Sequence, residues 1–154
     1  MDGPRWLDER ESRVWQGVVG LQLRLFPELE RQMMRDSGLS AAEFTLLVPL
    51  SESSGGVLRA RELGRMVGWE RSRLSHQVAR MEKRGLVIRE ECSEDARGSM
   101  VRITDAGRTA IVAAAPAHVE AVRRHFFDHL DHADLDVLGA ALNRVVHALP
   151  DTDC

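Results

Sequence analysis

The sequence contains no tyrosine, two cysteines and a single lysine beside twenty arginines. The cysteines, Cys92 and Cys154, are too few and too differently placed for the disulfide framework of a small secreted domain. No apolar run approaches the roughly 20 residues that a membrane-spanning helix requires, and residues 1–13 are charged, without the apolar core of a signal peptide. We therefore expect a cytoplasmic protein with no membrane partner.

The motifs of the common enzyme classes are missing as well. Catalysis needs a nucleophile with its base, a set of metal ligands or a phosphate-binding loop, and the sequence shows none of these patterns. The pair Gly55-Gly56, for example, is not followed by the Lys-Ser/Thr of a P-loop. We expect neither enzymatic activity nor a cofactor.

The sequence does have enough apolar residues for one core, together with an uneven distribution of charge. Hydrophobic residues make up 44% of the 154 residues, which suits a single domain over residues 1–154. The net charge is −3, but residues 59–89 hold nine basic and three acidic side chains, so this segment carries +6 and the rest of the chain −9. Such a distribution is typical of a protein that contacts phosphates through one basic lobe.

Residues 62–85 predict two helices joined by a turn. The first has apolar residues at helical spacing from Leu63 to Val67, and Gly68 ends it because glycine tolerates the backbone angles of a C-terminal cap. Trp69 lies in the turn. A second helix starts at Glu70, and its apolar stripe must be buried against the first helix; the stripe consists of Leu74, Val78 and Met81.

The opposite face of the second helix carries side chains that can hydrogen-bond to base edges or phosphates. They gather near the helix start, the end that a recognition helix inserts into the major groove. An arginine-rich face is more often simply solvated, but the turn before this helix and the hairpin after it favour DNA contact. The candidate contacts on this helix are Arg71, Ser72, Arg73, Ser75, His76, Gln77 and Arg80; Lys83, Arg84 and Arg102 are further candidates for phosphate contact.

A hairpin follows the second helix. Residues 86–89 and 100–103 predict its two strands, and residues 93–99 form a polar tip, so we expect a two-stranded wing. At the tip, the Asp95 carboxylate can hold the Arg97 guanidinium in one pose for entry into a narrow minor groove. The alternative is a tip that is only solvated.

Helices are expected before this region. Residues 6–34 predict one helix, which Pro27 should bend or break because proline has no N–H group to donate. Residues 41–50 predict another, opened by a capping box of Ser40 and Glu43.

Two more helices are expected after the wing. A linker over residues 51–56 leads into the DNA-binding lobe, residues 57–104. Residues 104–107 then open the next helix, since Thr104 or Asp105 can accept a hydrogen bond from its first free amides. Residues 108–128 and 135–149 predict two amphipathic helices, the last opened by Asp131 and Asp134.

Terminal helices with no domain of their own to cover would leave apolar stripes in water. Pairing with a second copy covers them. We therefore interpret residues 5–36 and 108–149 as dimerisation helices. The predicted fold is mainly α with a small β-wing, a winged helix-turn-helix flanked by N- and C-terminal dimerisation helices.

Four segments together resemble the multiple antibiotic resistance regulator (MarR) family: Glu62-Leu63-Gly64, the helix end from Val78 to Val87, Asp95-Ala96-Arg97, and Ile103 to Gly107. They occur in the right order and spacing, and the resemblance covers nearly the whole chain. It implies a homodimeric transcriptional regulator, commonly a repressor, that binds a pseudo-palindromic operator in double-stranded DNA. It also implies release by a small-molecule effector, and relatives favour anionic aromatics.

The family has no fixed effector motif, so effector residues rest on weaker signals. Trp15 and His118 could line a cavity between the DNA-binding lobe and the dimerisation helices, although core packing is the commoner role of such residues. His125, His129 and His132 have a spacing that could hold a metal, but no cysteine lies near them, and we expect no metal site.

Two alternative functions remain open. Some relatives sense oxidants through a thiolate, which Cys92 could supply, but Glu90, Glu91 and Glu94 surround it and disfavour the thiolate. The other alternative is a winged helix that binds only proteins, in which the second helix would present an apolar or acidic face.

Overall fold

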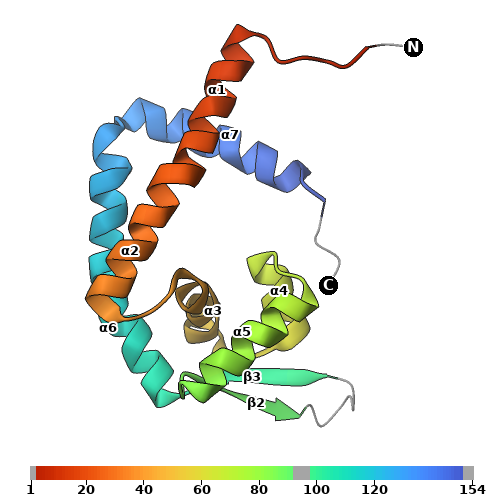
Figure 1. Cartoon of the computed structure of the whole chain (residues 1–154), viewed down its shortest axis with the longest axis vertical. Helices are drawn as coiled ribbons and strands as arrows, with labels where there is room; N and C mark the ends of the chain where they lie inside the picture. The colour runs from red at the N-terminus through yellow and green to blue at the C-terminus, as the bar shows by residue number, and fades with distance from the viewer. Residues whose placement is uncertain (1–2, 92–97, 151–154) are drawn as a thin grey trace.

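The computed structural model describes residues 3–91 and 98–150 (Figure 1). The chain is mainly α-helical and has one small antiparallel sheet, as predicted. The elements in chain order are α1 (Glu9–Gly20), the π-helical turn η1 (Leu21–Leu25), α2 (Phe26–Ser37), α3 (Ala41–Glu52), the 3-10 turn η2 (Ser54–Gly56), β1 (Val57–Arg59), α4 (Ala60–Val67), α5 (Arg71–Lys83), β2 (Val87–Glu91), β3 (Ser99–Ile103), α6 (Asp105–His125), the 3-10 turn η3 (Phe127–His129) and α7 (His132–Ala148).

The sheet has three strands in the order β1-β3-β2, rather than the two that the sequence predicted. β3 pairs with both neighbours, so that Val101 faces Leu58 of β1 and Arg89 of β2. β1 was missed because it is three residues long and runs directly into α4, which leaves no alternation to detect. The wing hairpin β2–β3 is therefore anchored to the start of α4 through β1.

The core of the DNA-binding lobe lies between α3, α4, α5 and the sheet. Its largest fully buried side chains are aliphatic and come from all of these elements: Leu46, Leu47, Leu50, Leu63, Val78, Met81, Val87 and Val101. Ile111 and Ala114 of α6 belong to the same core. The first half of α6 is therefore fixed to the lobe before the helix leaves it.

The N-terminal helical segment continues through Pro27, so of the two expected effects, a bend or a break, the break does not occur. Phe26 N–H bonds to Leu21 O, five residues back, which is the pattern of a π-turn. Pro27 then falls in the first turn of α2, where a missing N–H costs little. The predicted caps are confirmed: Ser40 opens α3 and Asp131 opens α7, each with a capping box.

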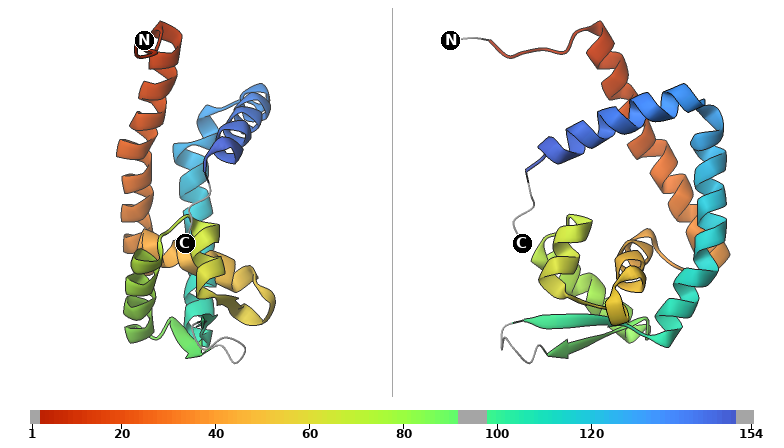
Figure 2. Two further views of the ribbon diagram at one scale, coloured as in Figure 1. Left: turned by 90° about the vertical axis from the view of Figure 1, so that its right-hand side faces the viewer. Right: turned by 180° about the vertical axis from the view of Figure 1, so that it is seen from behind.

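Two helices emerge from the lobe side by side. α2 packs against α6, and α1 continues the direction of α2 away from the lobe (Figures 1 and 2). After η3 the chain turns back, so that α7 runs above the lobe and, seen from the side, stands apart from α1 (Figure 2). Neither α1 nor α7 has a single buried residue.

Candidate nucleic-acid interface

The helix α5 lies on the surface of the lobe, and its apolar stripe packs into the core. Leu74, Val78 and Met81 are all buried, as predicted. Gly68, in the left-handed conformation (φ 67°), ends α4, and Trp69 follows it into the core with 8% of its surface exposed. This tight turn fixes the start of α5 relative to α4.

The outer face of α5 is polar and basic. Arg73 lies over the ring of Trp69, with its guanidinium carbon 4.1 Å from the ring centroid. A cation over an aromatic face restricts the arginine without neutralising it. The exposed residues of this face are Arg71, Ser72, Arg73, Ser75, His76 and Arg80.

Gln77 does not belong to that exposed face, and the prediction for it is corrected. It is three residues after Leu74 and four before Met81, so the helical period places it on the buried stripe. Only 4% of its surface is exposed, and its amide oxygen accepts hydrogen bonds from the Arg80 guanidinium. Gln77 therefore orients Arg80 instead of facing a nucleic acid.

Arg84, another candidate for phosphate contact, has hydrogen-bond partners within the fold; its side chain is 49% exposed, and phosphate contact stays a prediction. Its Nη1 donates to both carboxylate oxygens of Glu43 at 2.6 Å, and its Nη2 donates to the carbonyl of Gly38 at 3.2 Å. The adjacent Lys83 is exposed and remains a candidate for phosphate contact.

Arg102 is held in the same way by Glu90 on the neighbouring strand. Two parallel hydrogen bonds of 2.7 and 3.1 Å join them, and Nη1 of Arg102 donates to the carbonyl of Gly55 at 3.1 Å. The hydrogen bonds from Arg102 hold the pKa of Glu90 below its usual value, and Glu90 raises the pKa of Arg102. This pair connects β2 with β3 in the wing, and phosphate contact by Arg102 stays a prediction.

A hollow of about 510 Å³ lies between α4, α5 and the sheet. It is lined by Trp69 and by four arginines: Arg59 at the end of β1, Arg61 of α4, Arg71 of α5 and Arg89 of β2. Arg89 also donates to the Ser75 carbonyl at 3.2 Å, which ties β2 to α5. From the sequence, Arg71 is a candidate DNA contact, whereas Arg59, Arg61 and Arg89 contribute only to the local charge. Arg59 and Arg89 come near each other because β1 and β2 flank β3, a pairing between segments distant in sequence.

The wing tip lies outside the described residues. The predicted minor-groove pair Asp95 and Arg97 and the alternative thiol sensor Cys92 all fall there, so the structure adds nothing about them.

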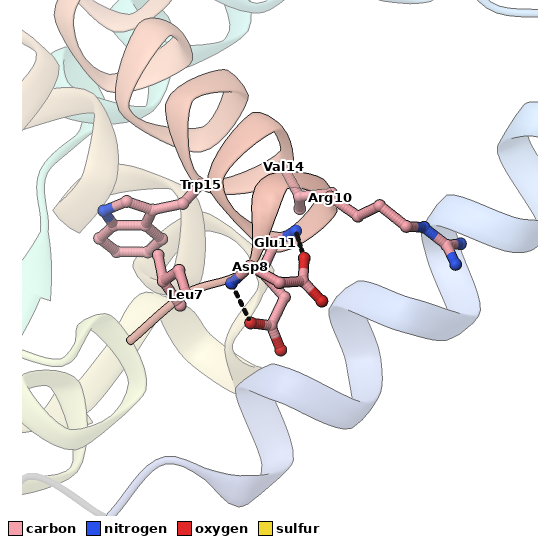
Figure 3. A pocket seen from close by; sticks show the side chains of 6 residues that line it. All are labelled: Leu7, Asp8, Arg10, Glu11, Val14 and Trp15. Carbon is pink, nitrogen blue, oxygen red and sulfur yellow. Dashed lines mark hydrogen bonds between the residues drawn. The ribbon is translucent and has the colours of Figure 1, made fainter. Parts of the chain in front are cut away.

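The two effector candidates lie in different surroundings. Trp15 is 58% exposed and lines a hollow of about 450 Å³ at the start of α1, where Figure 3 shows Leu7 and Val14 with it. His118, on α6, instead packs against the ring of Phe44 with centroids 4.6 Å apart. Trp15 lies on the part of α1 that extends away from the lobe, and the expected cavity that it would line with His118 stays a prediction.

His118 has an unusual environment. Its Nδ1 is buried and has no hydrogen-bond partner among the described residues, and burial lowers the pKa of the imidazole.

The three histidines considered for a metal site are spread over three elements: His125 ends α6, His129 lies in η3 and His132 begins α7. Within residues 3–91 and 98–150, no group of three or more His, Cys, Asp or Glu is placed to hold a metal.

No helix in the described part of the chain is long and apolar enough to cross a membrane.

Comparison with known proteins relates the chain to one family. Residues 37–98 match a family model described as MarR family. Comparison with curated proteins gave no significant match.

Three solved structures illustrate the relationship. Sco3205, a MarR family transcriptional regulator from Streptomyces coelicolor solved in complex with DNA, is 41% identical, with 97% of this chain and 93% of that chain covered and a TM-score of 0.91. AbsC, a MarR family transcriptional regulator from the same organism, is 38% identical, with 94% and 97% covered and a TM-score of 0.88. PcaV from S. coelicolor, solved with its natural ligand, is 24% identical, with 83% and 90% covered and a TM-score of 0.70, a likeness of fold.

The winged helix-turn-helix, the exposed basic face of α5 and the identity to two such regulators over nearly the whole chain agree with one another. The chain belongs to the MarR family of transcriptional regulators.

Proposed function

We propose that the protein is a cytoplasmic repressor that binds a pseudo-palindromic operator as a homodimer, with α5 in the major groove and the wing in the minor groove. The exposed basic start of α5 is the observation that carries this proposal. Arg71 and Arg73 project from the first turn of the helix, and the arginine-lined hollow beside them suits the phosphate backbone. Asp95 and Arg97 remain proposed minor-groove contacts.

The apolar surfaces of the terminal helices support the homodimer. Val14 and Leu23 near the N-terminus are each 69% exposed, and Val137 of α7 is 72% exposed. A monomer rarely leaves so many large apolar side chains of its helices in water, and a two-fold partner covers the same surface on both copies. The symmetry then presents two α5 helices to one duplex, with half-sites about 10 base pairs apart.

A small-molecule effector, an anionic aromatic in the first instance, remains part of the proposal. The buried Nδ1 of His118 beside Phe44 supports it, because a ligand could satisfy this atom. The site lies where α6 passes α3, between the lobe and the helices that set the distance between two lobes. PcaV, a protein of similar fold, was solved in complex with its natural ligand.

The alternative of a winged helix that binds only proteins has less support, since the outer face of α5 is neither apolar nor acidic. A mobility-shift assay with the region upstream of the gene distinguishes the two. We expect a retarded band at moderate salt that a scrambled duplex of equal length and composition does not give. Equal binding of both duplexes would contradict sequence-specific recognition.

A further inference from the structure

We propose that Glu43 and Arg84 are positioning residues for operator binding: together they form a clamp, the Glu43–Arg84 clamp, that fixes the end of α5 in its reading orientation. The inference rests on the proposed function of DNA binding. It assigns a role in operator affinity to a carboxylate that does not itself contact DNA.

The clamp joins segments that are 41 residues apart in sequence. Arg84 is the C-terminal cap residue of α5, and its Nη1 lies 2.6 Å from each oxygen of Glu43, in the first turn of α3. The Nη2 of the same guanidinium donates to Gly38, the left-handed residue that ends α2. One side chain therefore connects the end of α5 with both the end of α2 and the start of α3.

The two partners have different environments. The side chain of Glu43 is 5% exposed, whereas that of Arg84 is 49% exposed. Glu43 also accepts the Ser40 N–H at 2.9 Å as part of the capping box. A buried carboxylate without a partner is unfavourable in free energy, and this penalty keeps Arg84 paired with Glu43. A half-exposed arginine, by contrast, can be solvated if Glu43 is changed.

The position of the clamp explains why it bears on DNA binding. α2 packs along α6, so the turn at Gly38 moves with the helices that are proposed to form the dimer. Through Arg84 this turn is tied to the recognition helix. Loss of the clamp frees the end of α5 to tilt, and small displacements of a helix in the major groove break hydrogen bonds to base edges.

The clamp and direct phosphate contact by Arg84 predict opposite effects on operator affinity when the charge of Glu43 is removed. If Arg84 bound phosphate, removal of the Glu43 charge would leave operator affinity unchanged or raise it, because one negative charge near the duplex would be lost. If the pair positions α5, the same change lowers affinity. Glu43→Gln is the suitable variant, since glutamine at this position can still complete the capping box with Ser40.

The experiment uses the full chain as wild type, Glu43→Gln, Arg84→Met and the double variant, with Lys83→Met as the matched control for loss of one basic side chain. Fluorescence anisotropy with operator and scrambled duplexes is measured at several salt concentrations. We expect each single clamp variant to lose about 2- to 30-fold in operator affinity and the double variant to lose no more than the worse single one. Lys83→Met should change the salt dependence, and the clamp variants should not.

Amide hydrogen exchange in the free protein tests the clamp independently of DNA. Both single variants should exchange faster than wild type over residues 80–84, at the end of α5. Unchanged exchange, or Glu43→Gln binding the operator as tightly as wild type, would overturn the inference. If the variants exchange faster but the wild-type protein binds operator and scrambled duplexes equally, the proposed function is refuted. The clamp is then still supported as a contact that holds the end of α5.

Discussion

Gly107 lies in the first turn of α6, and replacing it with alanine should destabilise the protein although alanine favours helices. A Cβ atom at this position would lie 2.1 Å from the carbonyl oxygen of Leu86 and 2.9 Å from Cγ1 of Ile103. The obstacle is backbone, so the first turn of α6 must move away from the start of β2. That movement also pulls on the Thr104 cap, whose hydroxyl oxygen accepts the Gly107 N–H at 3.0 Å.

The magnitude follows from these two effects. Overpacking costs about 1 to 3 kcal/mol, and weakening of a helix cap costs about 0.5 to 2 kcal/mol, against a gain of about 1 kcal/mol from helix propensity. We expect Gly107→Ala to lose about 0.5 to 4 kcal/mol of unfolding free energy, net, in urea denaturation. The control is Gly139→Ala in α7, where an added Cβ meets no atom within 4 Å and stability should be equal or higher. Gly107→Ala unfolding within about 0.5 kcal/mol of wild type would refute the packing argument.

Three further predictions concern recognition, pH and assembly. Arg73→Ala should lose discrimination at a defined base pair, costing about 1 to 3 kcal/mol in competition binding; an unchanged preference at every operator base would show that α5 is misplaced. Because burial lowers the pKa of His118, the unfolded chain binds the proton more readily, and thermal stability should fall as the pH drops below about 6.5. His118→Gln should weaken this dependence of thermal stability on pH. The same dependence in the variant as in the wild type would show that His118 is not its cause. Val145→Glu on the exposed apolar stripe of α7 should yield monomers in sedimentation, whereas Asn143→Glu, about 200° around the helix, should not; equal masses for both would place the interface elsewhere.

Much of the fold could be predicted because its signals are local. The stripe of Leu74, Val78 and Met81 and the caps at Gly68 and Thr104 each depend on residues within one or two turns, and all of them appear in the structure. The boundaries differ by a few residues: α6, for instance, begins at Asp105 rather than at residue 108.

The features that were missed depend on contacts between distant segments. β1 exists only because Leu58 meets Val101, and Arg84 is occupied only because α3 brings Glu43 to it. The spacing from Leu74 to Gln77 indicates that Gln77 is buried, as the structure shows. The prediction placed it on the exposed face because its side chain is polar. Helical period is a better guide to which face a residue occupies than its chemical type.

The central claim is that two copies of the chain read one duplex through α5. Selection of binding duplexes from a random pool, followed by a mass measurement of the complex with the enriched sequence, tests it most directly. We predict an inverted repeat with half-site centres about 10 base pairs apart and two chains on each duplex. Enrichment of no inverted repeat, or a complex with a single chain on each duplex, would contradict the claim.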